Sequence, residues 1–409
     1  MKEIHKNKIT DHTRSEFLVY DPVSFTGGSK VAMSHIIEEC PNSRPIIITC
    51  DPDSWKSTYK IISIYLPKRL QRASSGLPFY GKQLLLGIQL SIIFLRYFRI
   101  KKIAVISGPA VDISALLLSQ LFRKYAIQLI QGPISRSKIA LLGLSMSRRI
   151  FYLASCQQNI TDLIQHKSES DIANIHQKSA IFTNGLPQHQ WPTPTLNINA
   201  DDIRIDCKDQ DNTNSLPSST SSRVFWAASL LKWKGIDILE KAINCHLKNT
   251  DIQAKICYIK PQNTALDCHP VPQNNNQISV WENPNNLDEI RSQCNIFVST
   301  SQHEPFGLSI LEAMAARLCP VIPKDGAYWD MQLTHGVNCF KYTPNDPQSL
   351  ARILWLLSRH TFCITSTGQR AQDIASQYKA KDTYRAIVQA LSEASFGNTP
   401  PKLNPRTKG

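Results

Sequence analysis

The alternation of short apolar runs with helical stretches is the feature that most constrains the fold of this chain. In the first half, strand-like runs occur at 17–20, 45–49, 61–65, 103–107, 127–131, 151–154 and 180–183. Helical patterns lie between them at 31–39, 82–97 and 113–123. Short apolar strands separated by helices are typical of a parallel sheet with crossover connections. The sequence therefore predicts the α/β fold class.

A polar stretch separates this first set from a second one. Residues 191–222 are rich in Pro, Asn, Asp, Ser and Thr, and such a composition buries too little apolar surface to offset chain entropy. Strand-like runs resume at 224–228, 254–259, 296–299 and 319–322, with a helical pattern at 236–246. We therefore expect an N-terminal domain at 17–190, a linker or surface loop at 191–222 and a second domain at 223–376. A helix at 377–396 and disordered ends at 1–16 and 397–409 complete the expected organisation.

Bulk properties favour a chain that stays inside the cell. A length of 409 residues fits two domains with a ligand-binding cleft between them, and 42% hydrophobic residues is typical of soluble globular proteins. Residues 1–14 lack the apolar core of a secretory signal. The eleven cysteines are scattered and never spaced Cys-x2-Cys, so we interpret them as reduced thiols. The expected location is the cytoplasm.

The positive charge is concentrated in one segment. The chain carries a net charge of +14, and residues 66–150 contain fourteen Lys/Arg and a single acid, Asp112. Within this segment, residues 84–100 are strongly apolar and end at Lys101-Lys102, but they are short for a membrane span. We expect a helix lying on an anionic membrane, on the inner face of the plasma membrane. The alternative is a core-facing helix with a solvated basic edge. No recognised nucleic-acid-binding module is present, so no nucleic-acid partner is expected.

The most informative stretch for chemistry is 303–312, which reads HEPFGLSILE and follows the strand-like run at 296–299. Gly307 lets the backbone approach a ligand closely, and the amides that open the next helix favour an anion such as a diphosphate. Glu304 and Glu312 flank these amides. One carboxylate is then able to address a sugar while the other accepts hydrogen bonds from ribose hydroxyls. On spacing alone, the alternative is a loop charge and a solvated helix residue.

This stretch resembles the Glu-x7-Glu signature of family-4 glycosyltransferases, with Phe306, Gly307 and Leu308 between Glu304 and Glu312. These enzymes have the GT-B architecture, in which an N-terminal acceptor-side and a C-terminal donor-binding Rossmann-like domain face each other across a cleft. The last helix of the family crosses back to the N-terminal domain, a role that the resemblance gives to the helix at 377–396. Other segments of the chain resemble that family in the same order. They are Gly27-Gly28 after the first strand, Asn184-Gly185, the segment FWAASLLKWKG that ends with Lys234-Gly235, Gly326, His335-Gly336-Val337-Asn338 and the helix start at 345–350.

The resemblance implies a retaining hexosyltransferase that takes a sugar from a nucleotide-sugar donor. It implies catalytic roles for Glu304 and Lys234 and donor binding by Gly27, Gly28, Phe306, Gly307, Leu308 and Glu312. Lys234 and the amides near Gly307 would stabilise the departing diphosphate, so no metal or other cofactor is expected. Two Asp-x-Asp stretches, 51–53 and 209–211, are interpreted as solvated loop acids. The alternative interpretations are that Gly27-Gly28 is a plain turn and that Lys234 is a surface lysine.

Two departures from the family pattern bear on activity. An arginine usually stands five residues before the lysine that corresponds to Lys234, and Ser229 occupies that position here. The N-terminal domain also lacks a clear counterpart of the family's histidine near the donor sugar. The expected acceptor is a glycan or lipid-linked precursor of a surface polysaccharide, lipopolysaccharide included. The alternatives are a nucleotide-sugar epimerase of the same architecture and a nucleotide-sugar-binding protein with weak or no transferase activity.

Overall fold

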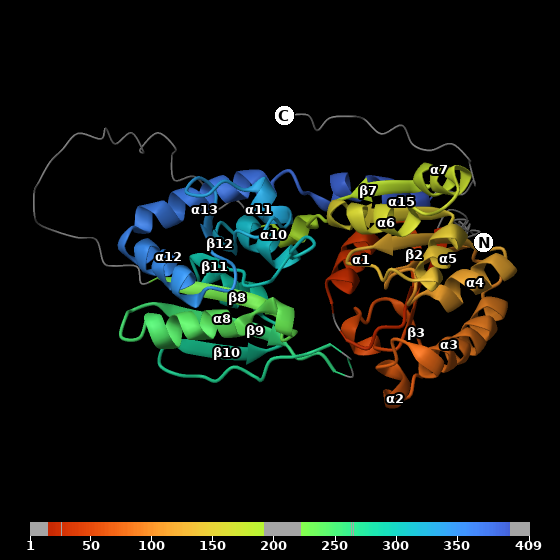
Figure 1. Ribbon diagram of the computed structural model, residues 1–409, viewed down its shortest axis with the longest axis horizontal. Helices are drawn as coiled ribbons and strands as arrows, with labels where there is room; N and C mark the ends of the chain where they lie inside the picture. Colours follow the sequence, from red (N-terminus) through yellow and green to blue (C-terminus); the bar gives the residue numbers. More distant parts are fainter. Residues whose placement is uncertain (1–14, 26, 192–221, 263, 265, 393–409) are drawn as a thin grey trace, which may run out of the picture. The chain divides into compact units, whose positions relative to one another are not determined.

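The computed structural model describes residues 15–25, 27–191, 222–262, 264 and 266–392 of the chain. The described residues form two compact units (Figure 1). Unit 1 comprises the chain up to Gly185, Pro261–Asp267 and the chain from Tyr378 onward, and unit 2 comprises Leu186–Lys260 and Cys268–Gln377. The expected linker at 191–222 and the tail at 397–409 lie almost entirely outside the described residues.

Unit 1 is built on a seven-stranded sheet in the order β3-β2-β1-β4-β5-β6-β7, in which every pairing is parallel. The strands are β1 (Ser15–Asp21), β2 (Ser43–Thr49), β3 (Lys60–Ser63), β4 (Lys102–Val105), β5 (Tyr125–Ile130), β6 (Arg149–Leu153) and β7 (Ser179–Phe182). Strand β1 starts at Ser15, so the expectation of a disordered N-terminus at 1–16 is wrong for Ser15 and Glu16, and the rest of that segment lies outside the described residues. All the other strand-like runs of the first half lie at these strands, with ends shifted by a few residues.

Helices cover both faces of this sheet, as a parallel sheet requires. Alternate residues of β1 show this, because Leu18 and Tyr20 join the apolar cluster formed with helices α3 and α4, while Phe17 and Val19 are equally buried on the other face. The helices are α1 (Gly28–Glu38), α2 (Lys68–Gln71), α3 (Gly76–Arg96), α4 (Ile113–Leu121), α5 (Lys138–Met146), α6 (Gln157–Ile164), α7 (Glu169–Gln177), α14 (Ala380–Thr383) and α15 (Arg385–Ser392).

Unit 2 repeats the plan with a six-stranded parallel sheet in the order β10-β9-β8-β11-β12-β13. Its strands are β8 (Arg223–Ser229), β9 (Gln253–Ile259), β10 (Ile278–Glu282), β11 (Ile296–Val298), β12 (Cys319–Pro323) and β13 (Phe340–Tyr342). Its helices are α8 (Ile236–Lys241), α9 (Leu287–Ser292), α10 (Leu308–Ala315), α11 (Tyr328–Gln332), α12 (Pro347–Arg359) and α13 (Thr361–Ala375). The predicted α/β class with two parallel sheets is confirmed.

Two predicted helices are divided in the structure. The pattern at 236–246 gives α8 only to Lys241, after which Ala242–His246 forms a π-helical turn. The stretch expected as one C-terminal helix gives α14 and α15, which belong to unit 1. The helix start expected at 345–350 is present, because the Asp346 side chain caps the amides of Gln348 and Ser349 and Pro347 occupies the first turn.

Candidate functional site

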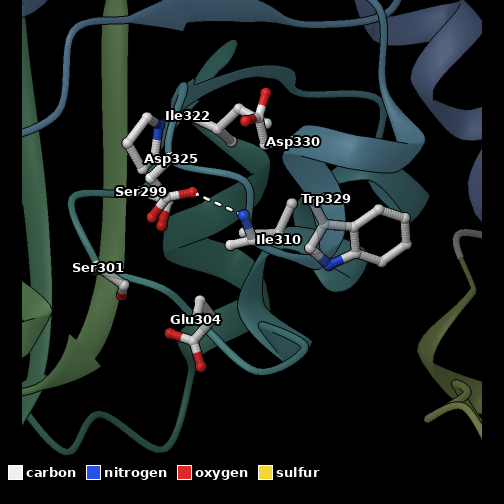
Figure 2. A pocket seen from close by; sticks show the side chains of 10 residues that line it. Ser299, Ser301, Glu304, Ile310, Ile322, Asp325, Trp329 and Asp330 are labelled. Atoms are coloured by element: carbon white, nitrogen blue, oxygen red, sulfur yellow. Dashed lines mark hydrogen bonds between the residues drawn. The ribbon is translucent and has the colours of Figure 1, made fainter. Parts of the chain in front are cut away.

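The candidate site lies in unit 2, where the segments that follow three neighbouring strands meet. Ligands of open parallel sheets bind at the carboxyl ends of the strands, where loops lead into the next helices. Here the loop after β8 carries Lys234, the loop after β11 carries Glu304, and the loop after β12 carries Asp325. Figure 2 shows the side chains of Glu304, Asp325, Trp329 and Asp330 around a small pocket, which is lined by the segments that follow β11 and β12.

Lys234 and Glu304 form an ion pair across two of these loops. The two residues lie 70 positions apart in the chain, and both side chains are mostly shielded from solvent. The Lys234 ammonium also lies over the ring of Trp233, 4.0 Å from its centroid. The structure thus brings together the two residues that the sequence predicts as catalytic.

A chain of hydrogen bonds fixes the Lys234 loop to the loop after β11. Trp226 Nε1 donates to Thr300 Oγ1 at 2.9 Å, and this hydroxyl donates to the Lys234 carbonyl at 2.7 Å. Gly235 has φ of +66°, and a Cβ at this position would lie 2.5 Å from the Thr300 carbonyl oxygen. Only glycine fits there, because the backbone is left-handed and the second loop lies against it.

Gly307 forms the junction between the loop and helix α10. Its φ is +79°, and its carbonyl accepts hydrogen bonds from the amides of Ile310 and Leu311 and from Trp329 Nε1. The first amides of a helix have no partner inside the helix, so the amides of Leu308 and Ser309 point away from the helix start. Helix geometry and dipole together favour an anion at this position.

The Phe306 side chain stabilises this junction by packing in the core beside it. Its side chain is buried and packs against Tyr328 and Trp329, with ring centroids 4.9 Å and 5.3 Å away. The sequence prediction assigned Phe306 to donor binding. The buried ring leaves only its backbone for such a contact, and its side chain holds the shape of the loop.

Glu312 lies in a second ion pair, which the sequence analysis missed. Glu312 Oε2 accepts from Arg291 Nη2 at 2.6 Å, and Arg291 also binds Asp288 at 2.5 Å. Burial raises the pKa of Glu312, and the Arg291 charge opposes that rise. Glu312 is therefore not the freely solvated helix residue of the alternative interpretation. Arg291 lies in α9, 21 positions before Glu312, and no sequence pattern indicated that the two residues would pair.

The Asp330 carboxylate anchors the far wall of the pocket. It pairs with Lys341 at 2.7 Å and accepts from the Gly326 amide at 2.7 Å. Burial raises the pKa of Asp330, but the hydrogen bonds from Lys341 and Gly326 outweigh it and lower the pKa overall. Gly326 and Gly336, which lie in segments that resemble the family, both have left-handed backbone, with φ of +76° and +73°.

The remaining predicted residues, Gly27 and Gly28, lie in unit 1. Gly27 precedes α1 in extended conformation, its carbonyl accepts from the amides of Lys30 and Val31, and α1 begins at Gly28. A Cβ at Gly28 would meet no atom within 4 Å, so the space beside it is open.

Just after this glycine pair, Lys30 is completely buried and paired with two acids. Lys30 Nζ lies 2.9 Å from Asp51 Oδ2 and 3.2 Å from Asp21 Oδ2. The prediction that Asp51 is a solvated loop acid is therefore wrong, because it neutralises a buried lysine. Asp53 is exposed, and the second Asp-x-Asp stretch at 209–211 lies outside the described residues. Among the residues that the structure describes, no group of three or more His, Cys, Asp or Glu is arranged to hold a metal ion.

Comparison with known proteins relates this chain to a class of enzymes. Residues 208–362, which carry most of unit 2, match the family model of glycosyl transferases, group 1. No curated protein matches the sequence. The family model describes transferases, so it gives no support to the epimerase alternative.

Solved structures match nearly the whole chain. Anabaena Alr3699/HepE, determined in complex with UDP-glucose, is 17% identical with a TM-score of 0.64, covering 92% of this chain and 99% of its own. A glycosyltransferase from Rickettsia africae is 13% identical with a TM-score of 0.64, covering 93% and 100%. WaaG, a glycosyltransferase involved in lipopolysaccharide biosynthesis, is 9% identical with a TM-score of 0.60, covering 92% and 99%. The chain thus has the GT-B fold, and with the family match it is a glycosyltransferase.

Proposed function

We propose that this glycosyltransferase moves a hexosyl group from a nucleotide-sugar donor to a hydroxyl acceptor, with retention of anomeric configuration and without a metal ion. The observation that carries this proposal is the Lys234–Glu304 ion pair beside the first turn of α10. It places a cation, a carboxylate and outward-pointing amides in one small region. The family-4 assignment and the retained configuration rest on the Glu-x7-Glu spacing.

The donor diphosphate fits the positive side of this region. The amides that open α10 bind one phosphate, and Lys234 binds the developing charge as the sugar departs. Because Lys234 is already held by Glu304 and by the Thr300 contact to its backbone, it needs little reorganisation when the donor enters. Glu304 also accepts from the sugar hydroxyls, which are hydrogen-bond donors that suit a carboxylate.

Glu312 contacts the ribose of the donor in this proposal. A carboxylate accepts up to about four hydrogen bonds, so its pairing with Arg291 leaves capacity for ribose hydroxyls. Arg291 is itself 8% exposed at its side chain and pairs with Asp288, which fixes the orientation of Glu312. Ser229 supplies no cation, so Lys234 carries more of the diphosphate charge than in relatives with an arginine there.

The proposed acceptor is a lipid-linked glycan or another precursor of a surface polysaccharide, used at the cytoplasmic face of the membrane. Support comes from the basic segment at 66–150 and from WaaG, which shares the fold and whose description names lipopolysaccharide biosynthesis. HepE binds UDP-glucose, so UDP-sugars are the first donors to test.

Titration calorimetry with UDP, GDP, ADP and their hexose conjugates tests the donor site. We expect one nucleotide to bind wild type, and Lys234→Ala to weaken it on the order of 10- to 100-fold, because a charge-assisted contact is lost and Glu304 is left uncompensated. The matched control is Lys241→Ala, since Lys241 is an exposed lysine of α8 that pairs only one turn away with Asp237.

Two outcomes would contradict the proposal. One is the absence of binding across the whole panel, which favours a non-catalytic protein. The other is equal binding by the Lys234→Ala and Lys241→Ala variants. Where turnover is found, the anomeric proton coupling of the product by NMR tests retention, and an inverted product removes that part of the proposal.

A further inference from the structure

Helix α3 (Gly76–Arg96) carries an apolar stripe on the face that points away from the core. Its members recur every three or four residues and so lie on one side of the helix. They are Leu77, Tyr80, Leu84, Ile88, Ile92 and Leu95, whose exposed fractions range from 54% to 85%. Exposed apolar side chains at single positions are ordinary, whereas a continuous stripe over five turns marks a surface that meets another apolar phase.

The opposite face of α3 is part of the core of unit 1. Leu86, Leu90, Ile93 and Phe94 are buried and pack with residues of β1, β2 and β4 in one apolar cluster. By length and composition α3 could cross a membrane. If α3 crossed a membrane, its buried face would lose its packing against the sheet. The fold therefore keeps α3 on the surface of unit 1. One face of α3 packs in the core, as the alternative sequence interpretation expects. The other face has the apolar composition expected of a helix that lies on a membrane.

Basic side chains stand at both ends of the stripe. Lys68, Arg69 and Arg72 are exposed on and just after α2, which packs against α3. Arg96, Arg99 and Lys101 are exposed at the other end. Asp112 is the one acid in residues 66–150, and it is completely buried, so no acidic side chain of this segment opposes the basic ones at the surface.

The neighbouring helix α4 also carries exposed apolar side chains. Helices α3 and α4 pack together in unit 1, as Figure 1 also shows. Leu117 and Leu121 of α4 are exposed by 44% and 74%, and Arg123 follows them on the surface. Two adjacent helices thus combine exposed apolar residues with a basic border.

We propose that the outer face of α3, extended by Leu117 and Leu121 of α4, docks unit 1 onto an anionic lipid bilayer. An amphipathic helix of this kind lies in the bilayer interface with its apolar side chains about 5–10 Å deep, while Lys and Arg bind anionic headgroups. The basic border selects this occupant over a second copy of the chain, because two such faces would bring like charges together. The inference rests on the proposed function for its purpose, which is access to a lipid-linked acceptor.

Vesicle co-sedimentation of the full chain tests the surface. We expect wild type to bind phosphatidylcholine vesicles that contain phosphatidylglycerol, and to bind pure phosphatidylcholine much less, with binding reduced by added salt. The Leu84→Gln/Ile88→Gln/Ile92→Gln variant should lose binding by on the order of tenfold or more, because three inserted side chains are replaced. Arg96→Gln/Arg99→Gln should reduce only the preference for the anionic vesicles.

The matched control is Leu356→Gln/Phe362→Gln, which changes exposed apolar residues of unit 2 and should bind like wild type. Wild type that stays in the supernatant at low salt overturns the proposal, and so does a triple variant that binds like wild type. A dimer in analytical ultracentrifugation that the triple variant loses also overturns it, since the occupant is then a second copy. Donor binding measured on the same samples reports on the transferase proposal separately.

Discussion

At the residue scale, the charged side chains of the candidate site are held in mostly buried ion pairs. Lys234 and Glu304 neutralise each other at the proposed donor site, and Arg291 does the same for Glu312. Removing one partner of a buried pair leaves an uncompensated charge, which costs more than the pair contributes to stability. We therefore expect changes at Glu312 to alter stability as well as the proposed donor binding. Lys234 and Glu304 are more accessible than Arg291, so changes there should be cleaner probes of binding.

Asp112 is the buried residue with the clearest consequence for pH dependence. Its Oδ2 accepts from the amides of Ser107 and Gly108 and from Gln128 Nε2, while Oδ1 has no partner in the described residues. Burial raises the pKa of Asp112 to about 8. Between about pH 4 and about pH 8, Asp112 therefore keeps its proton in the folded state. In the unfolded chain the pKa of an Asp is about 4, so the proton has been released in that range.

This shift predicts that unit 1 loses stability as the pH rises from about 4 to about 8, because the unfolded state binds fewer protons in that range. Asp112→Asn keeps the hydrogen-bond acceptor but does not ionise. We expect the variant to gain apparent melting temperature relative to wild type at pH 8, and to show a much smaller gain at pH 5. Calorimetric scans of both proteins across this range measure the difference, and a difference that does not change with pH would show that Asp112 is ionised in the folded state.

At the element scale, the start of α10 depends on one left-handed glycine. A Cβ on Gly307 would lie 2.9 Å from Ile310 Cδ1 and 3.0 Å from Glu304 Cγ, in addition to the strain of a φ of +79°. Gly307→Ala should therefore displace Glu304 and the first amides of α10. We expect weaker donor binding by on the order of tenfold, together with a cost of about 1–2 kcal/mol in stability from the backbone alone.

Gly336→Ala separates strain from displacement. Gly336 has a similar φ of +73°, but a Cβ there would meet no atom within 4 Å. The two variants should thus lose comparable backbone stability while only Gly307→Ala loses donor affinity, as calorimetry of unfolding and of binding would record. Equal donor affinity in the two variants would mean that the α10 junction does not contact the donor.

The elements also show which sequence signals are strong. The sequence predicted the central strands well, because β1, β2, β8 and β9 are buried on both faces and read as continuous apolar runs. It missed the edge strands β10 and β13, since Ile278–Glu282 and Phe340–Tyr342 are short and only partly apolar. The signature at 303–312 located the site because glycine, helix start and acids are local in sequence. The Arg291–Glu312 and Lys30–Asp51 pairs were missed because only the fold brings their members together.

At the scale of the whole molecule, the chain returns to unit 1 after completing unit 2. The C-terminal helix α15 packs with the first elements of the chain, α1 and β1, and α14 packs against α15. Tyr384 is completely buried, and its hydroxyl donates to Asn184 Oδ1 at 3.2 Å. Lys102 of β4 donates to the carbonyls of Ala390 and Leu391. Unit 1 is thus incomplete until α15, the last described helix, is in place.

A chain that ends at Gln377 should therefore lose stability in unit 1 specifically. The truncation exposes β1 and removes Tyr384, Ile387 and Leu391, all completely buried, and each large apolar side chain taken from a core costs about 2–5 kcal/mol. We expect a lower apparent melting temperature and faster hydrogen exchange in β1 and β4, with exchange in β8 and β9 unchanged. A chain that ends at Ser392 is the matched control and should behave like wild type. If both truncations keep the wild-type exchange of β1, then unit 1 is stable without α14 and α15, and the late helices contribute only surface packing.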